Sequence, residues 1–436
     1  MKRERALQRI KVDYQSKYDV VVFGGGSAGM CAAAQAAKSG AQTLLVEKGA
    51  SLGGTTTNGA VNYPGLFHAW GKQVISGVGW DIVSKSVELS NGRMPDFSVI
   101  PKSHHLHQVR INIPIYVALC DETMLNAGVH VLFHTLIVSI EDKSNDESKK
   151  ITICTKEGLK EIESKVVIDC TGDANASALA GLELMSSEEK QPATYSCEMT
   201  GYDMKTLDFD EINSNFKKWV ESGKGNYIDS SWVTDRPDVR RWLASGGMNA
   251  NHIPHYDAFS SFGKSQLELE GRATILRMYR FLKTQKGLDD LKINFLGTEC
   301  GVRETRKIIG EKCVTSEEYV SGKVWDDSLC HSFYPLDVHN LKKTGLKLVQ
   351  MKEGIVPTVP LGALMPKGTT NHLVAGRCVS SDQLANGAMR VQASCMAMGQ
   401  VAGATAALAT RDKKEIRQLE IKSIKNELIK HNAIVP

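Results

Sequence analysis

Residues 18–48 read YDVVVFGGGSAGMCAAAQAAKSGAQTLLVEK, which is the strongest structural signal in the chain. The apolar run after Tyr18 is typical of a parallel strand that is buried on both faces. An alanine-rich helix follows, and then a second apolar run that ends at Glu47. Between the first run and the helix, three glycines keep the GxGxxG spacing: Gly24, Gly26 and Gly29. This order predicts an α/β domain of the Rossmann kind.

The glycines and the helix start suit the binding of a dinucleotide. Gly24 allows a tight turn, Gly26 lets a pyrophosphate approach the backbone, and Gly29 lets the helix pack closely on the strand. The pyrophosphate would meet the N–H groups of the first helical turn, at Ser27 and Ala28, where the helix dipole favours an anion.

The carboxylate at the end of the second run completes the motif. Glu47 is placed to accept hydrogen bonds from ribose hydroxyls, and its charge disfavours a 2′-phosphate at this site. A lone GxGxxG is weak evidence, because glycine-rich turns also arise for packing alone. Here every part of the motif occurs in order, so the sequence predicts a dinucleotide site.

Composition excludes several classes of protein. The 436 residues are enough for two domains, and the net charge of +4 argues against a nucleic-acid or anionic-membrane partner. The first 17 residues are basic but lack the apolar segment of a secretory signal, and no run is apolar enough to predict a membrane span. The ten cysteines form no CxxC pair, which disfavours an iron–sulfur cluster, zinc or a redox disulfide. We therefore expect a cytoplasmic protein without a metal site.

Two later segments return to the pattern of the first domain. The run KVVIDCTGD (165–173) reads as a buried strand, and ligands gather at the carboxyl ends of parallel strands, so Thr171, Gly172 and Asp173 should border the cofactor. Near the C-terminus, a short strand over 372–375 precedes Gly376 and Arg377, and a small-residue helix begins near Val391.

From these segments we expect a discontinuous cofactor domain, an inserted α+β substrate domain and a charged C-terminal helix. The expected boundaries are 18–60, 115–190 and 355–410 for the cofactor domain, 61–114 and 191–354 for the inserted domain, and 411–436 for the helix.

Residues 297–315, GTECGVRETRKIIGEKCVT, are expected to form a helix with Arg303, Arg306 and Lys307 on one face. Such a face is either an exposed, salt-bridged surface or an anion-binding patch for a carboxylate or phosphate. His104 and His107 have a spacing that suits a metal, but no carboxylate accompanies them, so we expect a solvated loop there.

Several segments together resemble one family, the FAD-dependent oxidoreductases related to fumarate-reductase-like and glutathione-reductase-like flavoproteins. The resemblance extends from Tyr18 to about Leu408, and GVRETR and YPLDVH are its most specific segments. The segments are YDVVVFGGGSAG, LGGTTTNG, VVIDCTGDA, LEGR, GVRETRKIIGE, YPLDVH, LMPKG and NHLVAGRC to GQVAG. The resemblance implies a glutathione-reductase-type FAD-binding fold. It also implies noncovalent FAD, because LGGTTTNG has no counterpart of the histidine that carries FAD in succinate dehydrogenases.

The resemblance also implies which residues hold FAD. The ADP half would be held by Gly24, Gly26, Ser27, Ala28, Gly29, Glu47 and Lys48. Gly53, Gly54 and Thr55 would run beside the pyrophosphate and the ring. The ribityl chain and pyrophosphate would be flanked by Thr171, Gly172, Asp173, Gly376 and Arg377. Arg390 and Gln392, with the helix start, would approach the ring.

Catalysis would then combine hydride transfer at flavin N5 with proton transfer by the protein. Arg303 and Arg306 are expected to clamp a substrate anion. His339 is expected to exchange a proton near neutral pH, with Asp337 on the same face of an extended segment. A structural hydrogen-bonded turn is an equally good interpretation of Asp337 and His339.

The sequence thus favours an FAD-dependent oxidoreductase or dehydrogenase acting on a small organic substrate, with an unidentified electron donor or acceptor. The alternative is an electron-transfer flavoprotein subunit resembling the flavin subunit of heterodisulfide reductase, against which the lack of clustered cysteines counts. An RNA-modifying flavoprotein is disfavoured by the balanced charge. A homo-oligomer is compatible with the sequence.

Overall fold

The computed structural model describes residues 14–101, 103–142, 148–231, 235–254, 256–339 and 346–436. Within this part of the chain, seven strands form one sheet in the order β5-β2-β1-β8-β7-β6, with β19 also paired to β8. The parallel strands are β5 (His130–Leu132), β2 (Thr43–Val46), β1 (Lys17–Phe23), β8 (Gly158–Asp169) and β19 (His372–Val374). Strands β7 (Lys149–Thr155) and β6 (Leu136–Asp142) continue from β8 as an antiparallel meander.

Strand β1 lies in the middle of the parallel strands because it is apolar on both faces. Val20, Val21 and Val22 are fully buried, as a strand covered on both sides requires.

The helices of this lobe are α1 (Ser27–Lys38), α2 (Val78–Leu89), α3 (Ile113–Ala127), α4 (Asn175–Leu179), α8 (Ser316–Ser321), α9 (Gln383–Met389), α10 (Gln392–Asp412) and α11 (Ile421–Lys430). The 3-10 turns among the described residues are η1 (Gly54–Thr56), η2 (His104–His107), η3 (Tyr227–Asp229), η4 (Leu361–Ala363) and η5 (Ile416–Gln418).

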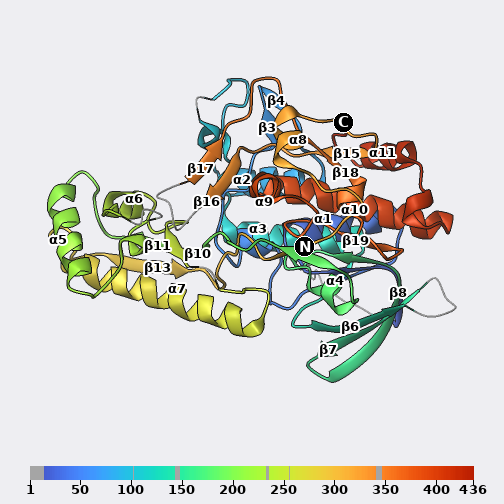
Figure 1. Ribbon diagram of the computed structural model, residues 1–436, viewed down its shortest axis with the longest axis horizontal. Coiled ribbons are helices and arrows are strands. Elements are labelled where there is room, and N and C mark those ends of the chain that lie inside the picture. The colour runs from blue at the N-terminus through green and yellow to red at the C-terminus, as the bar shows by residue number, and fades with distance from the viewer. Residues whose placement is uncertain (1–13, 102, 143–147, 232–234, 255, 340–345) are drawn as a thin grey trace, which may run out of the picture.

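Helices α1 and α10 pack against each other through small residues. A Cβ at Gly399 would lie 2.1 Å from the carbonyl oxygen of Ala28, and one at Gly403 would lie 2.2 Å from that of Ala32. This close packing joins two segments that are far apart in the sequence (Figure 1).

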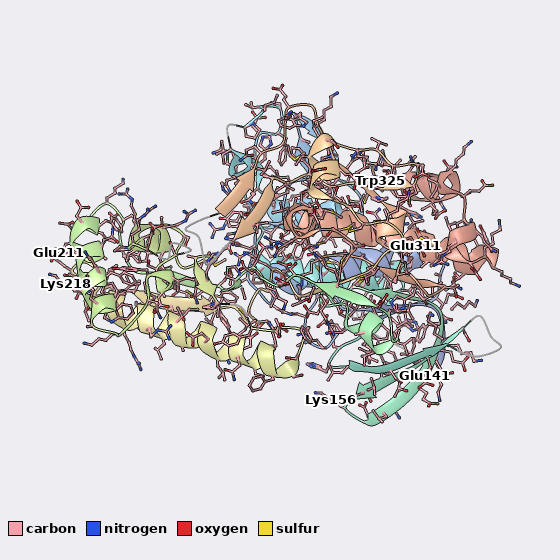
Figure 2. The ribbon with its side chains drawn as sticks, in the orientation of Figure 1. Glu141, Lys156, Glu211, Lys218, Glu311 and Trp325 are labelled. Atoms are coloured by element: carbon pink, nitrogen blue, oxygen red, sulfur yellow. The ribbon has the colours of Figure 1, made fainter. Side chains whose placement is uncertain are left out.

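A second lobe extends away from the sheet on the left of Figure 1. It contains β10 (Ala193–Tyr195), β11 (Cys197–Thr200), α5 (Phe209–Glu221), α6 (Val239–Ala244), β12 (Asn251–Ile253), α7 (Ser261–Leu282) and β13 (Lys292–Leu296). Helix α5 is amphipathic: Ile212 and Phe216 are buried, whereas Glu211 and Lys218 project from the end of the lobe in Figure 2.

Short antiparallel pairs complete the described fold. They are β3 (His68–Ala69) with β4 (Lys72–Gln73), β9 (Leu184–Ser186) with β14 (Arg306–Ile308), β15 (Ser328–His331) with β18 (Thr358–Pro360), and β16 (Leu336–His339) with β17 (Leu346–Val349).

The hydrophobic cores divide the chain differently from the predicted domain boundaries. The core of the second lobe is formed by buried residues between Ala193 and Cys300. The buried residues of 61–114 and 314–351 instead pack with α1 and α10 in the core beside the sheet.

Several predicted elements need correction. The helix expected over 297–315 is wrong: this segment is extended, with β14 as its regular part, because Arg306, Lys307 and Ile308 pair with β9. Helix α2 was not predicted, and the charged C-terminal helix is α11 with η5 before it. His104 and His107 are buried among aromatic rings, not solvated as expected. Among the described residues, no helix has the length and apolarity needed to cross a membrane.

Candidate cofactor and active site

The carboxyl edge of the parallel strands opens onto a cavity of about 350 Å³. The last residues of β1 and β2, Phe23 and Val46, lie on its wall, and helices α1 and α10 begin there. The second lobe closes another side with Ala258, Phe259, Ser260, Ser261, Lys264, Glu299 and Cys300. The cavity therefore lies where the rule for parallel sheets places a ligand.

The glycines of the first motif have two different functions. A Cβ at Gly24 (φ +92°) would lie 2.5 Å from the carbonyl oxygen of Cys170, and one at Gly29 would lie 1.7 Å from that of Gly24. At Gly26 the nearest heavy atom would be Gly54 Cα, 3.8 Å away. Gly24 and Gly29 therefore allow the turn itself, whereas Gly26 faces the open space of the cavity at the start of α1.

Glu47 is held on the cavity wall by backbone donors. Its Oε2 accepts a hydrogen bond from the N–H of Gly25 at 2.6 Å, and its Oε1 accepts one from the N–H of Gly49 at 2.7 Å. The side chain is 6% exposed. The carboxylate is thus fixed in position, as binding of ribose hydroxyls requires.

An ion pair between Asp173 and Arg377 also lines the cavity. The guanidinium Nη2 lies 2.5 Å from Asp173 Oδ1, which also accepts a hydrogen bond from Thr305 Oγ1 at 2.8 Å. Arg377 Nε is buried and has no hydrogen-bond partner among the described residues. Because an unsatisfied buried donor is costly, this N–H is suited to bind a ligand oxygen.

Charged side chains connect the first motif to the second lobe. Lys48 Nζ lies 3.0 Å from Glu299, and Lys264 Nζ lies 3.7 Å from the same carboxylate and donates to the carbonyl oxygen of Cys300 at 2.7 Å. Burial would raise the pKa of Glu299, but Lys48 and Lys264 lower it below its usual value. These contacts join the two lobes beside the cavity.

These residues fit FAD. Space at Gly26, the N–H groups at the start of α1 and the donors of Arg377 suit a pyrophosphate, and Glu47 suits a ribose. Helix α10 begins at Gln392, and the dipole at its N-terminus would favour negative charge on a flavin ring.

Most of the cofactor residues predicted from the sequence line the cavity. They are Gly24, Gly26, Ser27, Ala28, Glu47, Lys48, Gly54, Thr55, Thr171, Gly172, Asp173, Gly376, Arg377, Arg390 and Gln392. Gly29 and Gly53 instead shape the wall from behind: Gly29 packs on Gly24, and the Gly53 N–H donates to the carbonyl oxygen of Gly25 at 2.8 Å.

A group of polar side chains, which we call the His339 cluster, lies beside the cofactor cavity and includes one residue of its wall, Arg390. The other members are Arg303, Asp337, His339, His252 and Tyr334. Arg390 Nη2 donates to the backbone carbonyl of Asp337 at 3.2 Å, which connects the cofactor cavity to the cluster. His339 Nε2 lies 3.4 Å from Asp337 Oδ1, so the prediction that these two residues share a face of an extended segment is confirmed.

Arg303 is a buried cation within this cluster. It is 7% exposed and donates to the carbonyl oxygen of Pro192 at 2.7 Å and to His252 Nε2 at 3.2 Å. Burial and the nearby Arg390 lower its pKa. Among the described residues, neither Arg303 nor Arg390 has a carboxylate within ion-pair distance. Such a pair of cations is suited to bind an anion.

The local field sets the charges of Asp337 and His339. Burial and Arg303 lower the pKa of His339 to about 4. Burial would raise the pKa of Asp337, but His339, Arg390 and Arg303 together lower it to about 2. At neutral pH the carboxylate is therefore charged and the imidazole is neutral.

The structure does not bring Arg303 and Arg306 together. Because the segment is extended, Arg306 points elsewhere: it donates to the backbone carbonyl of Asp173 at 3.3 Å and to Asn175 Oδ1 at 2.8 Å. Its guanidinium also lies 4.4 Å from the centre of the Phe259 ring. The partner of Arg303 in the cluster is Arg390, not Arg306 as predicted.

Sequence reasoning missed His252, Lys264 and Glu299. No pattern in the stretch around His252 marks it, because its contact with His339 joins two lobes. Glu299 lies between Thr298 and Cys300 in a segment that was expected to be helical, where its partner Lys48 could not be foreseen.

Buried histidines predict acid sensitivity. Burial and His105 lower the pKa of His104 to about 4. The unfolded chain takes up this proton near pH 6.5 and the folded chain only near pH 4, so the free energy of unfolding should fall as pH drops between these values. The variant His104→Phe keeps an aromatic ring packed on Tyr334 but cannot take up the proton. Urea denaturation should therefore show that the free energy of unfolding falls less between pH 7 and pH 5 in this variant than in the wild type. An equal loss in both proteins would contradict this assignment.

A comparison with known protein families agrees with a cavity that fits FAD. A family model described as FAD dependent oxidoreductase matches residues 19–428. None of the curated proteins searched matches the chain.

Solved structures that are similar to the chain include a monooxygenase, a reductase-like protein and a hydroxylase. The chain is similar to p-nitrophenol 4-monooxygenase from Pseudomonas putida (12% identity, TM-score 0.42, 95% of this chain and 84% of that chain). It is also similar to a geranylgeranyl bacteriochlorophyll reductase-like protein from Thermoplasma acidophilum (15%, 0.40, 96% and 84%). A third is anhydrotetracycline hydroxylase from Streptomyces rimosus (16%, 0.30, 42% of this chain), of whose length the chain covers 38%.

Proposed function

Because the chain belongs to the FAD dependent oxidoreductase family, we propose that it transfers a hydride between N5 of a noncovalently bound FAD and a small, carboxylate-bearing organic substrate. The observation that carries this proposal is the position of Arg390. Its side chain lines the cofactor cavity and also donates to the backbone carbonyl of Asp337, which supports a substrate site adjacent to the cofactor.

Binding of the substrate is assigned to the two arginines of the cluster. Arg390 Nε is buried without a hydrogen-bond partner among the described residues, and it lies in the same cluster as the buried cation Arg303. A carboxylate would accept charge-assisted hydrogen bonds from this pair and offset their mutual repulsion. Asp337, charged and close to His339, would accept or return the proton that accompanies hydride transfer.

The topology also supports a glutathione-reductase-type cofactor domain, which we propose as its fold class. A meander of β6, β7 and β8 interrupts the parallel strands, and β19 returns to the sheet late in the chain.

The direct test is an anaerobic titration of the purified protein with FAD bound. Hydroxy acids, amino acids and other small carboxylates are added singly, and the flavin absorbance near about 450 nm is followed. Bleaching by one of these classes supports the proposal. Bleaching only by NADH or reduced ferredoxin would favour an electron-transfer role. Absence of flavin bands in folded protein offered FAD would exclude the cofactor assignment.

Two arginine variants should distinguish the effect of a charge inside the His339 cluster from that of a charge outside it. Arg390→Gln should lower the rate of flavin reduction by about 10- to 100-fold, because it removes a charge-assisted hydrogen bond to the substrate. Arg306→Gln removes an equal charge outside the cluster and should change the rate little. Both rates are measured by stopped-flow absorbance, and similar losses in both variants would contradict the assignment of Arg390.

A further inference from the structure

The two buried histidines of the His339 cluster come from different lobes and touch each other. His252 lies on β12 of the second lobe and is 1% exposed, whereas His339 ends β16 and is 9% exposed. His252 Nε2 lies 3.1 Å from His339 Nδ1, and the ring centres are 5.0 Å apart. This contact continues in both directions.

On one side, His252 Nδ1 lies 3.2 Å from the carbonyl oxygen of Ala250. A carbonyl only accepts, so this nitrogen carries a proton. Arg303 Nη2, which only donates, lies 3.2 Å from His252 Nε2. His252 Nε2 is therefore an acceptor, and His339 Nδ1 must supply the proton of their contact.

On the other side, His339 Nε2 faces Asp337 Oδ1 at 3.4 Å. The oxygen is buried and receives no well-aligned hydrogen bond from the described residues. From Ala250 through the two histidines to Asp337 there are three contacts, and each needs one proton. Two neutral imidazoles carry two protons between them. The chain of contacts is thus built to hold one more proton than its neutral histidines supply.

We propose that Asp337, His339 and His252 form a proton relay. His252 is a positioning residue that keeps a proton on Nδ1 of His339. The additional proton is then gained or lost between Nε2 of His339 and the carboxylate of Asp337. Oxidation of a C–H bond beside a hydroxyl or amine releases a hydride from carbon and a proton from oxygen or nitrogen. Bound FAD would supply the hydride acceptor, and the Asp337 end of the relay would take up the proton; reduction of a substrate would reverse both transfers. This last step rests on the proposed function, whereas the relay itself does not.

The charges around His339 determine the pH at which the relay takes up the additional proton. Arg303, Arg390, Asp337 and His252 act on it, Tyr334 and His104 face Asp337, and Arg241 acts on His252. The two arginines oppose a positive imidazole. An anion bound to them would offset this repulsion, so substrate binding and uptake of the additional proton are coupled.

The test is NMR of the FAD-bound protein with ¹⁵N-labelled histidine rings, titrated from pH 4 to pH 8, with the His339 signals assigned from their loss in His339→Gln. The relay predicts an Nδ1-protonated His339 in the wild type and a switch to the Nε2-protonated form in His252→Leu. His252→Gln, whose side-chain oxygen accepts a hydrogen bond, should keep the Nδ1 form, and His372→Gln, a buried histidine elsewhere, should change nothing. An Nε2-protonated His339 in the wild type would overturn the proposal.

Arg390→Gln imitates neutralisation by an anion and needs no ligand. It should raise the pKa of the His339–Asp337 pair by about one unit or more, whereas Arg306→Gln should leave it unchanged. Equal shifts in both variants, or none in Arg390→Gln, would overturn the coupling. The flavin spectrum of each sample reports the cofactor separately, so failure of the relay and failure of the proposed function can be told apart.

Discussion

Alanine at Gly29 should unfold the cofactor lobe, whereas alanine at Gly26 should leave it folded and unable to hold FAD. The Cβ at Gly29 would overlap the carbonyl oxygen of Gly24, a backbone atom that cannot move without breaking the turn. We expect Gly29→Ala to lower the free energy of unfolding by at least about 3 kcal/mol.

The neighbouring glycine is its matched control. Gly26 has φ −71° and ψ −171°, which alanine adopts readily, and its Cβ would enter the cavity. Without cofactor, the free energy of unfolding of Gly26→Ala should therefore lie within about 1 kcal/mol of the wild-type value. Its affinity for FAD should fall by about 100-fold. Urea denaturation and quenching of flavin fluorescence measure the two quantities. Equal stability of the two variants would contradict this division between the glycines.

The second large effect is expected at the ion pair of Asp173 and Arg377. Arg377→Met leaves the Asp173 carboxylate partly buried without its cation, so the free energy of unfolding should fall by about 3–5 kcal/mol. FAD binding should weaken too, because Arg377 lines the cavity.

A double variant separates charge from packing. In Asp173→Asn with Arg377→Met no charge remains unpaired, so part of the lost stability should return. Chemical denaturation of the two single variants and the double variant gives the coupling energy. If the double variant loses as much free energy of unfolding as the two single variants together, the ion pair contributes little to stability.

The sequence was sufficient for the cofactor half of the site because those residues follow local rules. The turn at Gly24, the acid at Glu47 and the strand end before Asp173 each have a fixed place in a parallel sheet, and this place can be derived from strand order alone. Most of these predicted residues line one cavity.

The substrate half could not be predicted because its contacts join segments with no common periodicity. His252 reaches His339 across two lobes, and Arg390 reaches the cluster from the end of α9. The error over 297–315 has a similar cause. Its charged residues suit a helix face, but pairing with β9 overrides that preference and turns Arg306 away from Arg303.

The packing of α1 against α10 has a consequence for biosynthesis. Residues 392–412 must be synthesised and leave the ribosome before they can cover α1 and complete the cavity wall at Gln392 and Cys395. A nascent chain that has emerged only as far as β8 offers the glycine turn without its opposite wall. Capture of FAD is therefore expected late in synthesis, only after α10 has emerged.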